Sequence, residues 1–251
     1  MGRALIATRM GFREQRRRGL LLVLLVTVPV LFITWSFAIT EPVPRAISLP
    51  GGALVLTDMQ QIHGAIMVPI TVGFLTGLLG LFIVSSALES DRRLVVAGFR
   101  PVEVIVPRFL VLAAGAILVT LVSIGVTMID FTPASWGPFV TGNLLSALIY
   151  GLIGGIAGVM FGQMGAVYFM FFLPMMDFGV AQNPMFFEGT PQGWTQLLPA
   201  YGPTRVLIDG AFSSGFDATG GVILALAWLT ALALVLVVLL TRSAHRGKQG
   251  S

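Results

Sequence analysis

Side chains able to carry out acid–base, nucleophilic or metal chemistry are scarce in this 251-residue sequence. It has no cysteine, which excludes disulfides, thiolate metal sites and cysteine nucleophiles. Its two histidines, His63 and His245, are expected in solvated or interfacial positions, one at an outer helix start and one in the tail. No glycine-rich phosphate loop, His-Glu-x-x-His, Gly-x-Ser-x-Gly or cluster at metal-ligand spacing occurs. The sequence therefore predicts no catalysis, no ATP hydrolysis and no cofactor or metal in this chain.

The acidic residues outside the charged loops are expected near one face of a membrane. Asp130, Asp177, Asp209 and Asp217 all fall close to the outer ends of apolar runs. Ion-coupled carriers need ionisable groups near the bilayer midplane, so this distribution argues against one. Asp177, which follows Pro174, is the one carboxylate that could lie below the interface. We favour the alternative, in which Asp177 ends a helix in contact with water.

The elements that must position these side chains are membrane helices. The chain is 56% hydrophobic and 10% charged, whereas a soluble domain carries about 25% charged residues. Continuous apolar runs near 20 residues favour helices over a β-barrel. We expect an all-α membrane protein with one transmembrane domain over residues 19–241. Its six transmembrane helices are predicted at about 19–40, 62–88, 104–129, 139–161, 166–181 and 220–241.

The basic residues predict the orientation of these helices. With six spans, both termini and the loop after the second span lie in the cytoplasm, and that side then holds 13 of the 15 Arg and Lys residues. Arg45 and Arg205 fall outside, so the positive-inside rule is satisfied. Residues 1–18 contain six arginines and form either a basic interfacial helix or an anchor for the first span. Residues 242–251 form a basic cytoplasmic tail.

Glycines recur at helical spacing in two of the predicted spans. Gly73, Gly77 and Gly80 would let the second span approach a neighbour closely. The fourth carries a run at every fourth residue, Gly154, Gly158 and Gly162. Helix packing is the favoured interpretation, and lining of a substrate path is the alternative.

The segment between residues 89 and 108 combines charge with apolar side chains. Its charges exclude it from hydrocarbon, so we expect a cytoplasmic loop. Four apolar residues lie within six positions and suit a docking surface, with charged residues at its rim. The alternative is an ordinary positive-inside loop, which explains the arginines but not the apolar residues. The predicted docking residues are Glu89, Arg92, Arg93, Leu94, Val95, Val96, Phe99 and Arg100.

The segment from residue 182 to 217 is too polar and too rich in Pro and Gly to span a membrane. We expect it to form an extracellular helical hairpin between the fifth and sixth spans. Its large apolar residues form either a gate over the exit of a path or an interfacial aromatic belt, and we favour the gate because the segment is longer than a connection needs. These residues are Trp194, Leu197, Leu198, Tyr201 and Phe212.

Taken together, these features resemble the ABC-2 type permeases, the membrane subunits of ATP-binding-cassette exporters. The resemblance covers nearly the whole chain but its motifs are loose. It depends on the six spans, the outer hairpin and the order of residues in the charged segment. There the matching residues are Glu89, Arg92-Arg93-Leu94, Ala97-Gly98, Arg100, Glu103 and Arg108. The uncharged turn at Gln163 departs from the family, because its second cytoplasmic contact would have little charge to use.

The resemblance implies a function and a set of partners. The charged segment would contain a coupling helix that docks on a separate ATPase subunit, present in two copies and holding ATP and Mg. A second permease, identical or homologous, would complete an exporter in the cell (inner) membrane, in contact with lipids and with no nucleic acid. The apolar spans favour a hydrophobic or amphipathic cargo such as a drug, antibiotic or lipid. A polysaccharide or glycolipid exporter, and a self-contained ion-coupled carrier or channel, are the alternatives.

Overall fold

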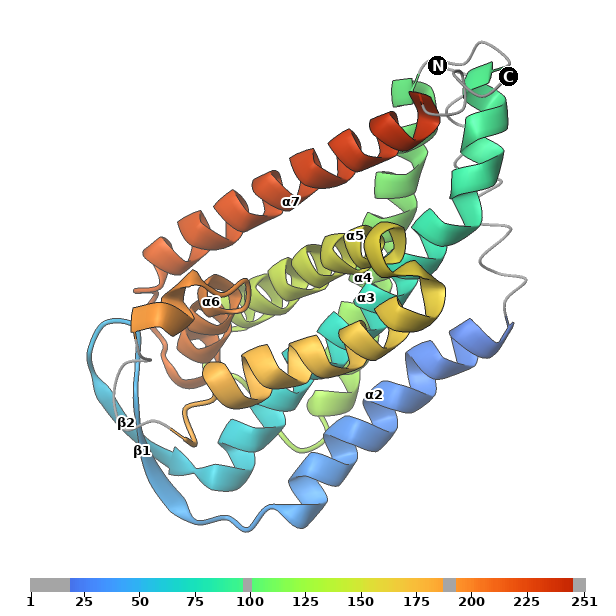
Figure 1. The fold of residues 1–251 in the computed structure, drawn as a ribbon. Helices are drawn as coiled ribbons and strands as arrows, with labels where there is room; N and C mark the ends of the chain where they lie inside the picture. The colour runs from blue at the N-terminus through green and yellow to red at the C-terminus, as the bar shows by residue number, and fades with distance from the viewer. Residues whose placement is uncertain (1–18, 97–100, 187–192, 246–251) are drawn as a thin grey trace.

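The structure is a computed structural model that describes residues 19–96, 101–186 and 193–245. Its elements are mostly helical and run in the order α2 (Gly19–Ile39), β1 (Pro44–Ser48), β2 (Leu54–Asp58), α3 (Met59–Val96), α4 (Pro101–Thr127), α5 (Trp136–Met176), the π-helix η1 (Asp177–Ala181), the 3-10 helix η2 (Gly193–Leu197), α6 (Tyr201–Phe212) and α7 (Thr219–His245). Figure 1 shows the long helices packed side by side.

The described helices include four that are long and apolar enough to cross a membrane. These stretches are Met59–Ser86, Glu103–Thr127, Trp136–Ala181 and Thr219–Arg242, and the apolar part of α2, Val23–Ile39, is shorter. Many large apolar side chains on α2, α4, α5 and α7 are exposed, as lipid-facing residues are. The composition-based prediction of a helical membrane protein is confirmed at this level.

The chain between α2 and α3 is a β-hairpin, which the sequence-based prediction of an all-α protein missed. Strands β1 and β2 pair antiparallel, with Pro44 opposite Asp58 and Ser48 opposite Leu54. Gly52 in the turn has φ +84°, a conformation that glycine adopts without steric cost. The Pro/Gly-rich stretch had indicated only a loop, because its short strands carry a weak periodic signal.

Helix α3 runs further than its apolar sequence suggested. It was expected to end near residue 88, but it continues to Val96, and α4 already begins at Pro101. The expectation of a loop over residues 89–108 that contains a separate coupling helix is corrected in one respect: its described part is helical and continuous with α3 or α4. Residues 97–100 lie outside the described residues. Leu and Arg are good helix formers, which favours the continuation of α3, and proline suits the first position of a helix, as at Pro101 in α4.

Helix α5 folds back on itself at Gly162. This residue has φ +69° and ψ 176° inside an otherwise helical stretch of 41 residues. The hydroxyl of Tyr150 lies 2.5 Å from a carboxylate oxygen of Asp177, whereas a straight helix would separate these residues by about 40 Å. Figure 1 shows the two arms, residues 136–161 and 163–176, running back along each other. The two helical segments predicted at 139–161 and 166–181 correspond to these arms, with the reversal at Gly162 rather than at 163–165, and their crossing of a membrane as two spans stays a prediction.

Glycines bring α3 and α5 into direct backbone contact. A Cβ on Gly80 would overlap the carbonyl oxygen of Gly151, and one on Gly154 would overlap that of Gly77. Gly158 faces Leu81 and Ser85 of the same helix α3. These glycines therefore serve helix packing, as predicted, and Gly162 belongs to the reversal instead of the packing face.

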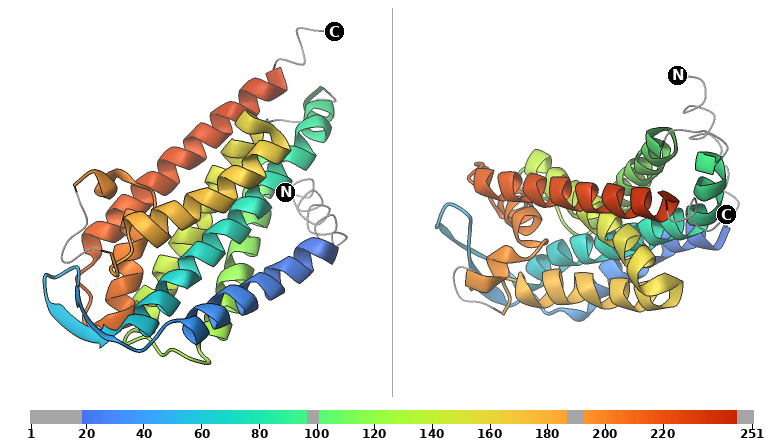
Figure 2. Two further views of the ribbon diagram at one scale, coloured as in Figure 1. Left: turned by 60° about the horizontal axis from the view of Figure 1, so that its bottom comes forward. Right: turned by 45° about the horizontal axis from the view of Figure 1, so that its top comes forward.

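The two ends of the bundle differ in structure. One end holds the β-hairpin, η2 and α6, and the other holds the end of α3, the start of α4, the reversal of α5 and the end of α7 (Figures 1 and 2). The buried core between them includes Tyr150, Phe139 and Phe178, each fully buried. These buried side chains lie between the two ends of the bundle.

Candidate functional site

The predicted docking residues lie at the end of α3 where the apolar stretch has finished. The apolar stretch ends at Ser86, so α3 extends ten residues, or about 15 Å, beyond it. Six of the eight predicted residues belong to this extension: Glu89, Arg92, Arg93, Leu94, Val95 and Val96. Phe99 and Arg100 lie outside the described residues. The extension is thus a helix instead of a loop, and its role in docking stays a prediction.

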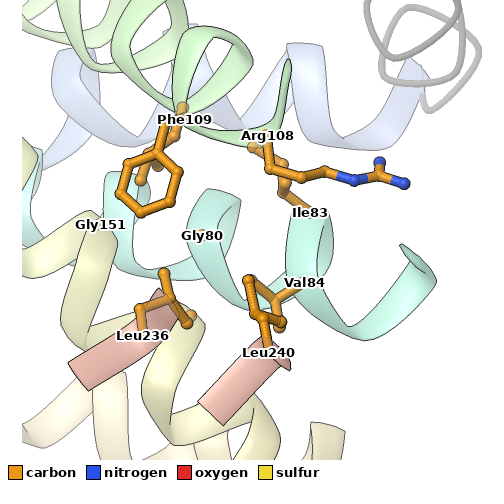
Figure 3. Close-up of a pocket in the computed structure, with 10 residues that line it drawn as sticks. Gly80, Ile83, Val84, Arg108, Phe109, Gly151, Leu236 and Leu240 are labelled. Atoms are coloured by element: carbon orange, nitrogen blue, oxygen red, sulfur yellow. The ribbon is translucent and has the colours of Figure 1, made fainter. Parts of the chain in front are cut away.

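The start of α4 carries the two charged residues that complete the resembling segment. Glu103 lies in the first turn of α4, where a carboxylate interacts favourably with the helix dipole. Arg108 lines a small apolar cavity of about 10 Å³ together with Gly80, Phe109 and Leu236. Figure 3 shows its guanidinium pointing away from this cavity, so the stem packs while the charge extends outward.

The predicted gate residues differ in exposure. Trp194 and Leu197 in η2 are 61% and 75% exposed, and Leu198 and Tyr201 are half-buried. Phe212, at the far end of α6, packs on Phe131 with ring centroids 5.9 Å apart. The gate interpretation stays a prediction, but Phe212 is part of the core and differs from the exposed pair.

Helix α6 is held by backbone contacts at the end of the bundle that also holds the β-hairpin. A Cβ on Gly142 of α5 would meet the backbone of Leu207, and one on Gly202 would meet the carbonyl oxygen of Gly221 in α7. The carbonyl of Gly210 accepts a hydrogen bond of 2.8 Å from the N–H of Ser135, just before α5. Helix α6 is therefore a rigid extension of α5 and α7.

Asp209 of α6 also fixes the start of α7. One of its carboxylate oxygens accepts hydrogen bonds from the N–H groups of Asp217 at 2.7 Å and Ala218 at 3.0 Å. These groups precede the first turn of α7, so a buried carboxylate from a neighbouring helix caps it. This role is structural, and it explains one of the four outer carboxylates.

Asp177 joins three elements at the first residue of η1. Its side chain is only 3% exposed, so the predicted contact with water is wrong. The same carboxylate oxygen accepts hydrogen bonds from the Tyr150 hydroxyl at 2.5 Å and from the N–H of Ala200 at 3.1 Å. Tyr150 belongs to the first arm of α5, and Ala200 is the residue before α6. Asp177 therefore links both arms of α5 to the outer helix.

A second buried contact lies beside this junction. The side-chain amide of Gln182 donates a hydrogen bond of 2.8 Å to the carbonyl of Thr195 in η2. The ring of Phe178 lies 5.1 Å from that of Tyr150 and covers the junction. Sequence reasoning missed Tyr150, although a lone tyrosine in an apolar run signals that its hydroxyl needs a buried partner.

Two apolar hollows open on the sides of the bundle. One, of about 550 Å³, lies between α4 and α7. The other, of about 380 Å³, lies between α2 and α3 and includes Trp35 and His63. In the part of the chain that the structure describes, no group of three or more His, Asp or Glu residues could hold a metal ion. The described residues thus offer packing surfaces and two buried carboxylate junctions, at Asp177 and Asp209.

Neither a protein-family model nor a curated protein matches this chain.

Proposed function

We propose that this chain is the membrane subunit of an ABC exporter of the ABC-2 permease type. It would move a hydrophobic or amphipathic small molecule outward, driven by a separate ATPase. Its six spans would be α2, α3, α4, the two arms of α5, and α7, with both termini in the cytoplasm. The observation that carries the proposal is the helical extension of α3 beyond its apolar stretch.

The extension supports coupling because of its length and its charge. Helix α3 has 38 residues and is about 57 Å long, whereas the hydrocarbon core of a bilayer is about 30 Å thick. Glu89, Arg92 and Arg93 are too costly to place in hydrocarbon, so the extension must stand in water at the cytoplasmic face. A helix that continues without a break from a span is suited to pass on a displacement imposed by a partner.

Contacts of α3 with α5 connect the extension to the opposite end of the bundle, where α6 lies. Because Gly77 and Gly80 touch the backbone of α5, a movement of α3 cannot be absorbed by flexible side chains. The first arm of α5 carries Tyr150, whose hydroxyl is bonded to Asp177, which in turn binds the start of α6. A continuous series of packed backbone and hydrogen bonds thus runs from the proposed ATPase contact to the outer helix.

The test is charge reversal in the extension. The chain is purified with the ATPase subunit recovered from its own membranes, and ATP turnover is measured in proteoliposomes with and without export cargo candidates. The double variant Arg92→Glu/Arg93→Glu should reduce turnover of the complex at least tenfold. Arg45→Glu, a reversal on the outer strand β1, is the matched control and should leave turnover unchanged. Equal turnover in the double variant and the control would refute coupling through this extension.

A self-contained ion-coupled carrier is the second candidate, and the buried Asp177 favours it. An ionisable group that is 3% exposed and lies between packed helices is a common feature of proton pathways. Uptake into liposomes driven by a proton gradient, without any ATPase and abolished by Asp177→Asn, would establish this function and remove the first. Absence of such uptake would leave Asp177 with the structural role described above.

A further inference from the structure

The hollow between α4 and α7 lies at the end of the bundle that the proposed function places in the cytoplasm. It is lined by the early turns of α4 and the late turns of α7. Its lining residues are Ile105, Val106, Phe109, Leu110, Leu229, Thr230, Ala233, Leu234, Val237 and Thr241. Residues 229–241 rise about 18 Å along α7, close to the roughly 15 Å depth of one leaflet's hydrocarbon. The hollow, called here the α4–α7 groove, therefore matches one leaflet in length.

The polar atoms in the groove are already satisfied by their own helix. The hydroxyl of Thr230 donates to the carbonyl of Leu226 at 2.8 Å, and that of Thr241 to Val237 at 2.9 Å. An occupant with its own hydrogen-bonding groups would gain little here. Hydrocarbon suits the groove better, and its volume of about 550 Å³ lies within the 300–1,000 Å³ of known ligand sites.

The side chains of the groove argue against a helix as its occupant. Close helix contacts in membranes use small residues, and this chain uses glycine in this way at the α3–α5, α5–α6 and α6–α7 contacts. The lining of the groove contains no glycine: its small residues are Ala233, Thr230 and Thr241, and the other seven are branched aliphatic or aromatic. A flexible acyl chain can follow such a surface, whereas a second copy of the chain would meet it poorly.

The charges at the mouth of the groove favour an anionic headgroup. Arg242 directly follows the lining residue Thr241 and is exposed. Arg108 and Glu103 both lie near the start of α4, at the same end of the bundle, although Arg108 lines the neighbouring small cavity and not the groove itself. The balance at this level is positive, as required for binding a phosphate.

We propose that the α4–α7 groove binds one anionic phospholipid of the cytoplasmic leaflet, with an acyl chain along Ala233 and its phosphate at Arg242. The inference depends on the membrane orientation within the proposed function but not on transport or on an ATPase. It identifies a lipid that stays with the protein, in contrast to the freely exchanging lipid around the rest of the bundle.

The test measures lipid retained by the purified chain. The protein is equilibrated in nanodiscs with equal amounts of phosphatidylglycerol and phosphatidylcholine, extracted into mild detergent, and examined by native mass spectrometry. We expect about one phosphatidylglycerol per chain and little phosphatidylcholine. Ala233→Trp should fill the groove and remove the retained lipid. Val235→Trp, at a 47% exposed site on the opposite side of α7 by helical spacing, is the matched control and should keep it.

The headgroup is tested separately by Arg242→Gln. This variant leaves the groove intact and should reduce the preference for phosphatidylglycerol about fivefold, the factor that one basic residue contributes near an anionic surface. Equal retention of both lipids by the unaltered chain, or retention by Ala233→Trp, would overturn the proposal. So would a change of oligomeric state in Ala233→Trp without loss of lipid, because the groove would then be a contact between copies. None of these outcomes bears on ATP turnover, so the proposed function is tested independently.

Discussion

Replacing Asp177 by alanine should destabilise the protein far more than its place at a helix end suggests. The change removes the acceptor of two buried donors, the Tyr150 hydroxyl and the N–H of Ala200. A buried donor left without a partner costs about 1–3 kcal/mol, so the two together should lower the free energy of unfolding by about 4 kcal/mol. At about 2–4 °C per kcal/mol for a chain of this size, the midpoint of thermal unfolding should fall by roughly 8–16 °C.

The assay is thermal unfolding in detergent, followed by the fluorescence of the four tryptophans. Asp130→Ala is the matched control because Asp130 is an exposed outer carboxylate. A surface change of this kind should alter stability by no more than about 0.5 kcal/mol. A loss in Asp177→Ala that does not exceed the loss in Asp130→Ala would refute the reasoning.

Tyr150→Phe tests the same hydrogen bond, because it should lower the stability of the unaltered chain but raise the stability of the Asp177→Ala variant. In the unaltered chain it removes a hydrogen bond to a carboxylate and should cost about 1.5–3 kcal/mol. In the Asp177→Ala background it removes a hydroxyl that has lost its partner, so it should restore about 1–3 kcal/mol. Equal destabilisation in both backgrounds would mean that the two side chains do not depend on each other.

Two further predictions concern glycines of the bundle. Gly154→Ala should prevent close packing of α3 and α5, because the added methyl would overlap the carbonyl oxygen of Gly77. We expect the variant to lose its monodisperse peak in size-exclusion chromatography. The control Gly125→Ala, whose added methyl meets no atom within 4 Å, should elute like the unaltered protein. Gly162→Ala should cost about 1–3 kcal/mol in thermal unfolding although nothing lies within 4 Å of the added methyl, since φ +69° with ψ 176° is almost restricted to glycine. An unfolding midpoint for Gly162→Ala equal to that of Gly125→Ala would contradict this assignment of strain.

The membrane character of the chain and most of its helices follow from the sequence alone. Hydrocarbon excludes unpaired backbone groups and charge, so each apolar run must be helical, whatever surrounds it. The packing role of Gly77 and Gly154 could also be predicted, since small residues at helical spacing have few other uses in a span. These conclusions concern local composition and need no knowledge of which helices are neighbours.

The ends of helices that extend beyond the apolar stretches were less predictable. Beyond Ser86 no hydrophobic stretch marks the course of α3, and its continuation to Val96 depends on the weak preferences of individual residues. The hairpin β1–β2 was missed for a related reason, because a five-residue strand carries too short a pattern to recognise. The predicted coupling residues up to Val96 therefore lie on a continuation of α3, whereas the sequence had suggested a separate helix within a loop; their role in coupling stays a prediction.

The tertiary structure alone decided which polar groups meet. Asp177 and Tyr150 are 27 residues apart, and only the reversal at Gly162 brings them to 2.5 Å. The same folding leaves Trp194 exposed and packs Phe212 on Phe131, although both were assigned to one gate. Sequence composition determines that a chain enters the membrane, because transfer to hydrocarbon is a property of each segment. Burial of a carboxylate depends on a second segment that supplies its hydrogen-bond donor, so it is decided only when the two segments pack together.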